Sequence, residues 1–293
     1  MSYFKVLGFD REPFSTSPDP EFFFLSKEHE TALTNILIEL RLKRGLSVIL
    51  GDVGTGKTTL SRKLIQELKS REDFIFHIIL NPSFESEEIF LKSLVRNFEI
   101  PDFSGTPNPS VLDLRETLER FLYQKGVTEG KTVVILVDEA QKLNEVTLEN
   151  LRILLNYETN EFKLLQLILL GQLEFYSRIV TMQNFFDRIS FKYTLNPLDF
   201  EETRDMIEFR VRHAGFKPDS GIFLADAVQI IHSYTRGYPR QVNMLCHKAL
   251  KLLVLRNKLV VDEDIIKELI DEEVQSGWQR KHHVLQNAAI TVN

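Results

Sequence analysis

The chain has 293 residues, of which 43% are hydrophobic and 27% are charged, and its formal net charge is −6. This length is enough for one large or two ordinary domains with a sizeable core. The acidic balance argues against a strongly basic nucleic-acid binder, although a local basic patch remains compatible with it. The single cysteine, Cys246, excludes an intrachain disulfide, as is typical of a reducing compartment. Cys246 falls in an apolar helical pattern and is expected to be a packed core thiol rather than a reactive one.

The sequence contains no obvious membrane signal. The N-terminus does not have the basic start and long apolar stretch of a signal peptide. No apolar run reaches the ~18 residues that a membrane helix needs. We therefore expect a cytoplasmic protein, which a partner would have to recruit for any role at the inner membrane face.

The N-terminal segment, residues 1–27, is rich in Phe, Pro, Ser and Asp. It predicts an ordered loop that packs on the core, because its aromatic residues favour burial while its prolines exclude regular structure. Phe22, Phe23 and Phe24 are interpreted as core anchors rather than as a base-stacking platform. A helix with an apolar stripe is predicted over residues 28–44.

Short apolar runs then alternate with helical patterns. Nearly continuous runs lie at 46–50, 74–80, 132–137 and 163–170, and a weaker, alternating run at 189–195 predicts an edge strand. Continuous hydrophobicity is typical of parallel strands that are covered on both faces. The alternation predicts a doubly wound α/β domain over residues 28–196.

After residue 196 the pattern becomes entirely helical. Helical patterns lie at 199–214, 222–234, 239–257 and 263–273, with no strand-like run between them. They predict a small all-α domain over residues 197–275, with Pro197 at the boundary. Residues 276–293 predict a mobile tail. The basic and aromatic WQRKHH stretch within it (278–283) is interpreted as solvated rather than as a contact to nucleic acid or lipid.

A complete G-x-x-x-x-G-K-[ST] motif runs from Gly51 to Thr58, after an apolar strand and at the start of a helix. The N–H groups of such a loop face phosphate oxygens, and the helix dipole adds positive potential. Lys57 is expected to reach the β- and γ-phosphates, and the Thr58 hydroxyl to hold Mg²⁺. The alternative, a glycine-rich turn without a ligand, is disfavoured by this context.

An acidic pair, Asp138-Glu139, ends the apolar run of TVVILVDEAQKL. Asp138 is expected near the magnesium. Glu139 is then the general base that polarises the attacking water, an effect worth roughly 10²–10⁴ in rate. An acidic cap for the next helix is the alternative. Gln172 follows the next strand and is expected to orient the same water, unless it is only a polar strand end.

Three arginines are candidates for stabilising the charge that develops during phosphoryl transfer. Arg188 directly precedes the fifth strand, and Arg178 lies one helix earlier. Either is a possible finger supplied to a neighbouring subunit. Arg240 begins a helix of the second domain after a Gly-x-Pro turn that fixes its direction. Solvation at the surface is the alternative for each.

The sequence resembles an AAA+ ATPase in the motifs it contains and in their order, which is the phosphate loop, VDEAQ, the GQ strand end, DRI and GYPRQVNMLCHKAL. More narrowly, they resemble the ExeA/GspA-like group of secretion-associated ATPases, whose N-terminal stretch is similar to residues 8–33. The similarity covers roughly residues 3–275. It implies a P-loop core with a five-stranded parallel sheet, a helical lid, and ATP held between the subunits of an oligomer.

The resemblance also implies roles for individual residues. The implied nucleotide contacts are Asp52, Val53, Gly54, Thr55, Gly56, Lys57, Thr58, Thr59 and Arg240. Asp138 and Glu139 become the Walker B pair, Gln172 the first sensor, Arg188 the candidate finger and Arg240 the second sensor. His29 falls where this family places a histidine near the nucleotide base, and a packed or capping histidine is the alternative.

The leading expectation is an ATP- and Mg²⁺-dependent ATPase that forms a homo-oligomeric ring or filament. It would act as a motor or switch in a secretion- or pilus-type envelope assembly, with a membrane-associated partner. Typical secretion members continue into a membrane helix and a peptidoglycan-binding domain, whereas this sequence ends after the lid. That departure weakens the inference of an envelope role.

Two alternatives stay open. The same core resembles the TniB/TnsC-type ATPases, which implies a DNA-dependent regulator of transposition. The missing membrane helix favours this alternative, and the acidic balance disfavours it. The other alternative is a scaffold that binds ATP and barely hydrolyses it, against which the intact Glu139 counts.

Overall fold

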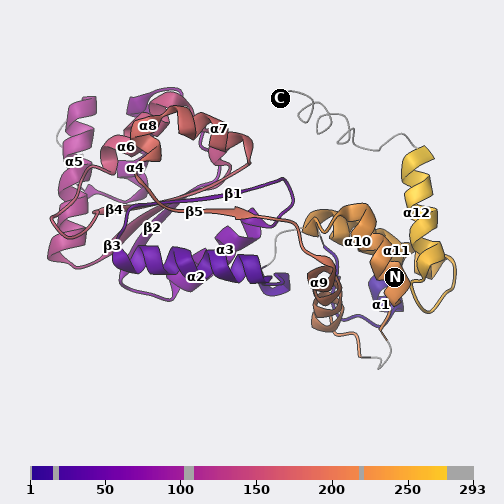
Figure 1. The fold of residues 1–293 in the computed structure, drawn as a ribbon. Coiled ribbons are helices and arrows are strands. Elements are labelled where there is room, and N and C mark those ends of the chain that lie inside the picture. Colours follow the sequence, from indigo (N-terminus) through magenta and orange to yellow (C-terminus); the bar gives the residue numbers. More distant parts are fainter. Residues whose placement is uncertain (1, 16–19, 102–108, 218–220, 276–293) are drawn as a thin grey trace. The chain divides into compact units, whose positions relative to one another are not determined.

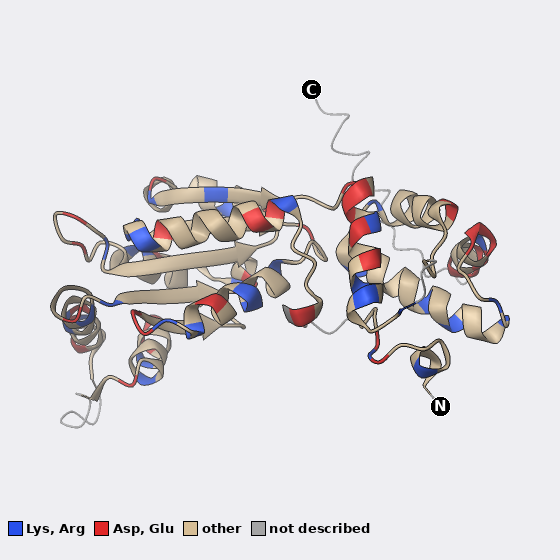
Figure 2. Ribbon diagram, turned by 90° about the horizontal axis from the view of Figure 1, so that it is seen from below, with Lys and Arg blue, Asp and Glu red and all other residues tan. Residues whose placement is uncertain are grey.

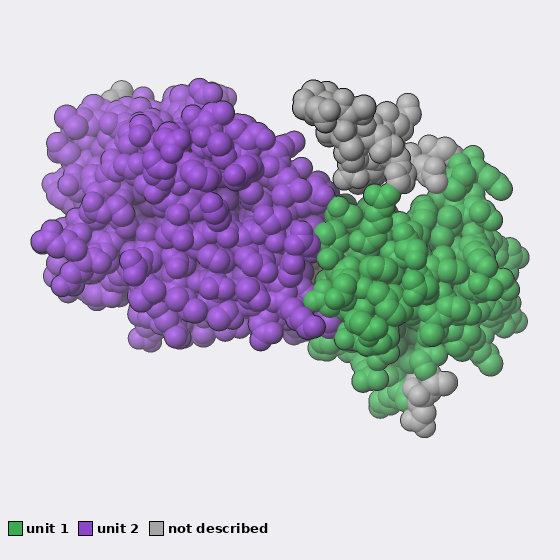
Figure 3. All heavy atoms as spheres, viewed as in Figure 1, with its two compact units in different colours: residues 1–17, 197–293 green, residues 18–196 purple. Residues whose placement is uncertain are grey.

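A computed structural model describes residues 2–15, 20–101, 109–217 and 221–275 (Figure 1). The predicted tail, including residues 278–283, lies outside the described residues. The chain divides into two compact units, one of residues 18–196 and one of residues 1–17 together with 197–293 (Figure 3).

The unit of residues 18–196 is built on a five-stranded parallel sheet. Its strands are β1 (Leu46–Gly51), β2 (Phe74–Ile79), β3 (Thr132–Val137), β4 (Leu165–Gly171) and β5 (Ile189–Leu195). Their order is β2-β3-β4-β1-β5, so the weaker fifth run is an edge strand as predicted. The α/β fold and the five parallel strands are confirmed.

Helices cover both faces of this sheet (Figure 1). Side chains alternate along a strand, so Val48 and Leu50 join one hydrophobic cluster while Ile49 joins the other. The first cluster is covered by α4 (Glu87–Asn97), α5 (Val111–Tyr123), α6 (Glu145–Leu154), α7 (Glu174–Thr181) and α8 (Gln183–Phe186). The second is covered by α2 (Lys27–Leu42) and α3 (Lys57–Lys69). Burial on both faces is the physical reason for the continuous apolar runs.

Short helices and caps complete this unit. The short helices are η1 (Pro20–Phe22), η3 (Gln124–Thr128, a π-helix) and η4 (Ala140–Lys142). Ser86, Ser110 and Asn144 precede α4, α5 and α6, and each side chain accepts a backbone N–H of the first turn. Such caps satisfy N–H groups that the helix itself leaves unpaired.

The second unit is helical. It contains α1 (Tyr3–Val6), α9 (Phe200–His213), α10 (Ala225–Thr235), α11 (Pro239–Leu255) and α12 (Glu263–Gln275). Asp199 and Glu202 form a capping box that begins α9 directly after the unit boundary. Cys246 on α11 is fully buried, as predicted, and this burial raises the pKa of its thiol.

The N-terminal segment differs from the expectation that all of residues 1–27 pack on the α/β core. Residues 2–15 pack on the helical unit instead. Phe9 stacks on Phe216 with ring centroids 4.8 Å apart. Arg210, buried in α9, donates from Nε to the Pro13 carbonyl at 2.8 Å. A buried guanidinium needs acceptors, and the irregular backbone of this segment supplies them. Only the later part, from residue 20 on, joins the α/β unit.

Lys and Arg are interspersed with Asp and Glu on the helices of both units (Figure 2). Lys63 and Glu67 on α3, 2.9 Å apart, are one such pair with i,i+4 spacing. Pairs of this kind contribute only about 0.2–0.5 kcal/mol each, so they act mainly in solvating the surface. None of the helices within the described ranges combines the length and apolarity that crossing a bilayer requires.

Candidate nucleotide-binding site

The loop of the phosphate-binding motif connects β1 to α3. Gly56 has a φ of 99°, in the left-handed region that favours glycine. A Cβ at Gly56 would lie 2.7 Å from His29 Nε2, so a side chain here is excluded by space as well. Lys57 follows as the first residue of α3, and its Nζ donates to the carbonyl oxygens of Gly51 at 2.7 Å and Asp52 at 2.8 Å.

The other loop residues that the resemblance implies as nucleotide contacts differ in burial, and their contact with a nucleotide stays a prediction. Thr55 is buried and donates from Oγ1 to the Asp52 carbonyl at 2.9 Å. Val53 at the tip is 47% exposed. The partly buried residues of the loop and of the first turn of α3 are Asp52, Gly54, Gly56, Thr58 and Thr59. A loop of this composition leaves room for a phosphate to approach its backbone closely.

Lys57 is surrounded by acidic groups. Its side chain is buried, and burial lowers the pKa of the ammonium. The carboxylates of Glu139, Asp138 and Asp52 oppose this effect and favour the charged form. The structure therefore brings the loop lysine and the acidic pair into one electrostatic environment.

Asp138 directly follows β3 and is only 4% exposed. Burial raises the pKa of its carboxyl group, while hydrogen bonds from the Glu139 backbone N–H (2.9 Å to Oδ1) and from the Thr58 side chain act in the opposite direction. Thr58 and Asp138 are thus neighbours. A hydroxyl and a carboxylate are the oxygen ligands that Mg²⁺ prefers, so these residues fit the predicted metal.

Glu139 has an unusual backbone. Its φ of 56° and ψ of 40° place it in the left-handed region, which is rare for a residue with a side chain. Such strain is frequent at functional sites. Glu139 Oε2 accepts a hydrogen bond from Gln141 Nε2 at 2.7 Å, and Lys142 Nζ lies 3.9 Å from the same oxygen.

Gln172 follows β4, which lies between β3 and β1 in the sheet. It therefore stands at the carboxyl edge between the acidic pair and the phosphate loop, where the sequence analysis places it. Its backbone N–H donates to Gln141 Oε1 at 3.1 Å. Gln141 was missed as a site residue, although it stands two positions after Glu139 in the DEAQ motif.

His29 lies beneath the phosphate loop. It is 2% exposed, and its Nε2 donates to the Thr55 carbonyl at 2.9 Å, which leaves Nδ1 to accept from Ser26 Oγ at 2.6 Å. The ring of Phe23 contacts it edge-on. Burial lowers the pKa of the imidazole. Both ring nitrogens are occupied within the chain, so His29 supports the loop backbone, and its contact with a nucleotide base stays a prediction.

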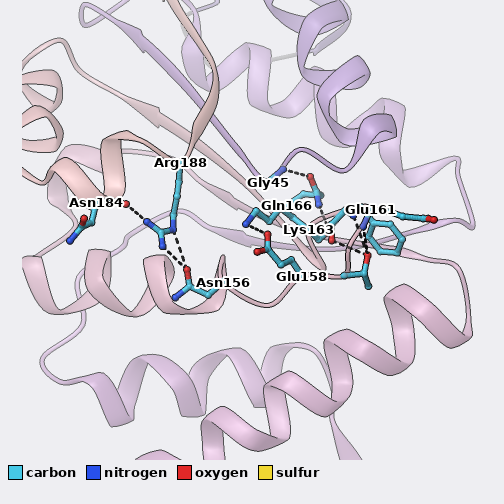
Figure 4. A network of polar contacts seen from close by, with 10 residues as sticks. Gly45, Asn156, Glu158, Glu161, Lys163, Gln166, Asn184 and Arg188 are labelled. Carbon is cyan, nitrogen blue, oxygen red and sulfur yellow. Dashed lines mark hydrogen bonds and ion pairs between the residues drawn. The ribbon is translucent and has the colours of Figure 1, made fainter.

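The candidate finger Arg188 lies far from this edge. It precedes β5, whose first residue Ile189 pairs with Leu46 at the start of β1, so Arg188 is at the amino edge of the sheet. Its Nε and one terminal nitrogen donate to Asn156 Oδ1 at 3.2 and 2.7 Å, and the other donates to the Asn184 carbonyl (Figure 4). Six strand residues at about 3.3 Å each separate the two edges.

Arg178 is engaged elsewhere. From α7 it donates to the carbonyl oxygens of Gln141 at 2.7 Å and Leu143 at 2.6 Å, in the segment that follows the acidic pair. Arg240 belongs to the helical unit, where it is exposed in the first turn of α11. The structure therefore assembles the phosphate loop, the acidic pair and Gln172 within one unit.

Comparison with known proteins agrees with this geometry. A family model described as an AAA domain matches residues 40–179, which span β1, the acidic pair and β4. The chain has the AAA+ P-loop fold. Its structural neighbours carry this fold at low sequence identity. The Aeropyrum pernix ORC2 protein is 18% identical with a TM-score of 0.61, over 90% of this chain and 72% of that one.

Two further neighbours are a Drosophila ORC structure bound to DNA and the Thermotoga maritima RuvB Holliday junction branch migration motor. The ORC chain is 18% identical with a TM-score of 0.65, covering 93% of this chain and 66% of that one. RuvB is 15% identical with a TM-score of 0.53, covering 83% and 68%. These likenesses show the AAA+ fold alone.

One curated relative is similar in sequence. This AAA+ chain is 36% identical over 250 residues to General secretion pathway protein A of Aeromonas hydrophila. The match covers 85% of this chain and 44% of the relative, so the chain spans less than half the length of the protein it matches. The predicted resemblance to the GspA-like group is confirmed.

Proposed function

We propose that this AAA+ protein binds and hydrolyses Mg-ATP, and that it does so as a homo-oligomer. The observation that carries the proposal is the meeting of Lys57, Thr58 and the Asp138-Glu139 pair at the carboxyl edge of one sheet. Lys57 would exchange its bonds to the loop carbonyls for the β- and γ-phosphates. Thr58 and Asp138 would hold the Mg²⁺, which supplies charge stabilisation on the phosphate oxygens.

Glu139 acts as the general base in this proposal. Water attacks the γ-phosphorus, its proton passes to the Glu139 carboxylate, and the bond to the oxygen that bridges the β- and γ-phosphates breaks to release ADP. Gln172, at the neighbouring strand end, would help to orient the water. The left-handed backbone of Glu139 supports this assignment because such strain is frequent where a side chain must be aimed.

The oligomer is supported by the place of Arg188. The guanidinium stands at the amino edge of the sheet, about 20 Å from the phosphate loop by strand length. It cannot act on the nucleotide of its own chain from there. If a second copy of the chain brings its phosphate loop to this edge, Arg188 would act in trans as the arginine finger for the nucleotide of that copy. Arg240 would act as the second sensor.

The cellular role is proposed from sequence similarity. The curated relative is a general secretion pathway protein, so we place this chain as a motor or switch in an envelope assembly, recruited from the cytoplasm by a membrane-associated partner. The alternative is a DNA-dependent regulator of the TniB/TnsC type. The net charge of −6 counts against it.

Glu139→Gln and Lys57→Ala test the enzymatic proposal. Glu139→Gln is expected to bind ATP normally, to accumulate an ATP-bound oligomer and to lose roughly 10²–10⁴ in turnover. Lys57→Ala is expected to lose nucleotide binding. Glu116→Gln, exposed on α5, is the matched control. Turnover at the parental rate by Glu139→Gln would show that another group is the base.

Double-stranded DNA separates the two roles. DNA binding through phosphate contacts weakens steeply as salt rises. The ATPase rate and particle size are measured with and without duplex DNA across a salt series. Indifference to DNA at low salt is expected for the envelope role, whereas stimulation that disappears at high salt supports the transposition-type regulator.

A further inference from the structure

Gln141 connects three parts of the proposed site. Its Nε2 donates to Glu139 Oε2 at 2.7 Å, and its Oε1 accepts from the Gln172 backbone N–H at 3.1 Å. Its own carbonyl accepts from Arg178 at 2.7 Å. A single side chain therefore joins the carboxylate after β3 to the end of β4, and α7 holds its backbone in place.

The direction of these bonds matters for Glu139. A carboxylate on a flexible side chain has two equivalent oxygens and can rotate. When Oε2 accepts the amide N–H, the orientation of the group is set and Oε1 is left to accept the proton of a water. The amide of Gln141 is itself oriented, because the Gln172 N–H donor requires the amide oxygen on that side.

Arg178 extends the same support. Its two donors bind the carbonyls of Gln141 and Leu143, on both sides of Lys142, at 2.7 and 2.6 Å. These bonds hold the segment that carries Gln141 against α7. Arg178 is therefore held at the segment that follows the acidic pair, whereas Arg188 is held by Asn156 and Asn184 at the opposite edge of the sheet.

We infer that Gln141 is a positioning residue that aims the Glu139 carboxylate, and that Arg178 maintains its position within the same subunit. The inference rests on the proposed role of Glu139 as the base. Glu139 remains the group that meets the water, and Gln141 acts only through it.

Two substitutions at one position separate this role from a structural one. Gln141→Glu keeps an oxygen for the Gln172 N–H but replaces the donor to Glu139 with a second carboxylate oxygen. Gln141→Leu removes both bonds. Each is expected to lower kcat by about tenfold to a hundredfold, as for loss of a hydrogen bond to a charged group. The KM and the affinity for a fluorescent ATP analogue should stay unchanged.

A double-mutant cycle supplies the decisive readout. In a Glu139→Gln background, Gln141→Leu is expected to have no further effect on single-turnover hydrolysis, because the group it positions is gone. Gln66→Leu, exposed on α3, is the matched control for loss of an amide. Thermal unfolding verifies that each variant is folded. If Gln141→Leu does not fold, the kcat of Gln141→Glu tests the inference in its place.

These experiments distinguish failure of the inference about Gln141 from failure of the proposed function. Absence of hydrolysis in the parent protein, or full activity of Glu139→Gln, contradicts the proposed function itself. If the parent hydrolyses ATP and Glu139→Gln does not, parental kcat in both Gln141 variants overturns the inference. The inference is also overturned if Gln141→Leu slows single-turnover hydrolysis by the same factor in the Glu139→Gln background as in the parent, because Gln141 would then act independently of Glu139.

Discussion

His29 Nε2 donates a hydrogen bond to the carbonyl oxygen of Thr55, 2.9 Å away, in the middle of the phosphate loop. The bond joins the first turn of α2 to the loop between β1 and α3, which are 26 residues apart in the chain. The imidazole is buried and neutral in this arrangement, with Ser26 on its other nitrogen. The histidine thereby supports the backbone that is proposed to bind phosphate.

His29→Ala is expected to weaken ATP binding because the Thr55 carbonyl loses its buried partner and the loop loses its support. Leaving a buried hydrogen-bonding group without its partner costs about 1–3 kcal/mol. We expect this loss to lower the Tm of the variant and to raise its Kd for a fluorescent ATP analogue. His77→Ala, on the edge strand β2, is the control. Equal affinity in both variants would exclude a supporting role for His29.

The pH dependence of stability follows from the same residue. Burial holds the pKa of folded His29 below its ordinary value of 6.5, so the unfolded chain takes up a proton first as the pH falls. The stability that the uncharged His29 contributes to the folded protein is complete above about pH 6.5, and it is lost as the pH falls toward the pKa of His29 in the folded state. We expect the parent to lose more unfolding free energy than His29→Gln between about pH 7.5 and pH 5.5. Equal losses would contradict this assignment.

Mixing experiments distinguish the two arginines. A Lys57→Ala subunit lacks a working loop but keeps Arg188, so it can complete the site of an Arg188→Ala neighbour. Partial recovery of ATPase activity is expected in that mixture. No recovery is expected when Arg178→Ala is mixed with Lys57→Ala, because Arg178 supports the site of its own chain. Recovery in both mixtures would assign both arginines to the interface.

Asn156→Ala tests the orientation of the finger. Asn156 Oδ1 accepts two N–H groups of Arg188 at 3.2 and 2.7 Å. Because the pair is partly solvated, its loss is expected to lower kcat by about fivefold, or ~1 kcal/mol, without changing nucleotide affinity. The Arg188→Ala, Asn156→Ala double variant should be no slower than Arg188→Ala alone. A further decrease would show a separate role for Asn156.

The thiol of Cys246 should be unreactive in the folded protein. It is fully buried on α11, and burial raises the pKa of the thiol, so little of the reactive thiolate is present near neutral pH. We expect labelling by DTNB only after unfolding in denaturant. Labelling of the native protein within minutes would mean that α11 opens readily.

The sequence alone determined the fold class and the sheet strands, and it indicated which residues form the core of the candidate site. The motif from Gly51 to Thr58 and the Asp138-Glu139 pair were identifiable because both are local patterns. Glycine, lysine and hydroxyl residues at fixed spacing specify a phosphate loop, and carboxylates after a buried apolar run specify a strand end. Near-continuous hydrophobicity indicated a sheet that is buried on both faces.

The tertiary structure decided which side chains those local patterns meet. Only folding places Gln141 between Glu139 and the N–H of Gln172, because the two strand ends become neighbours through the order of the sheet. The same holds for His29 beneath Thr55, for residues 2–15 on the helical unit, and for the separation of Arg178 from Arg188. Contacts between residues far apart in the chain depend on strand order and packing, and no spacing within a single chain segment encodes them.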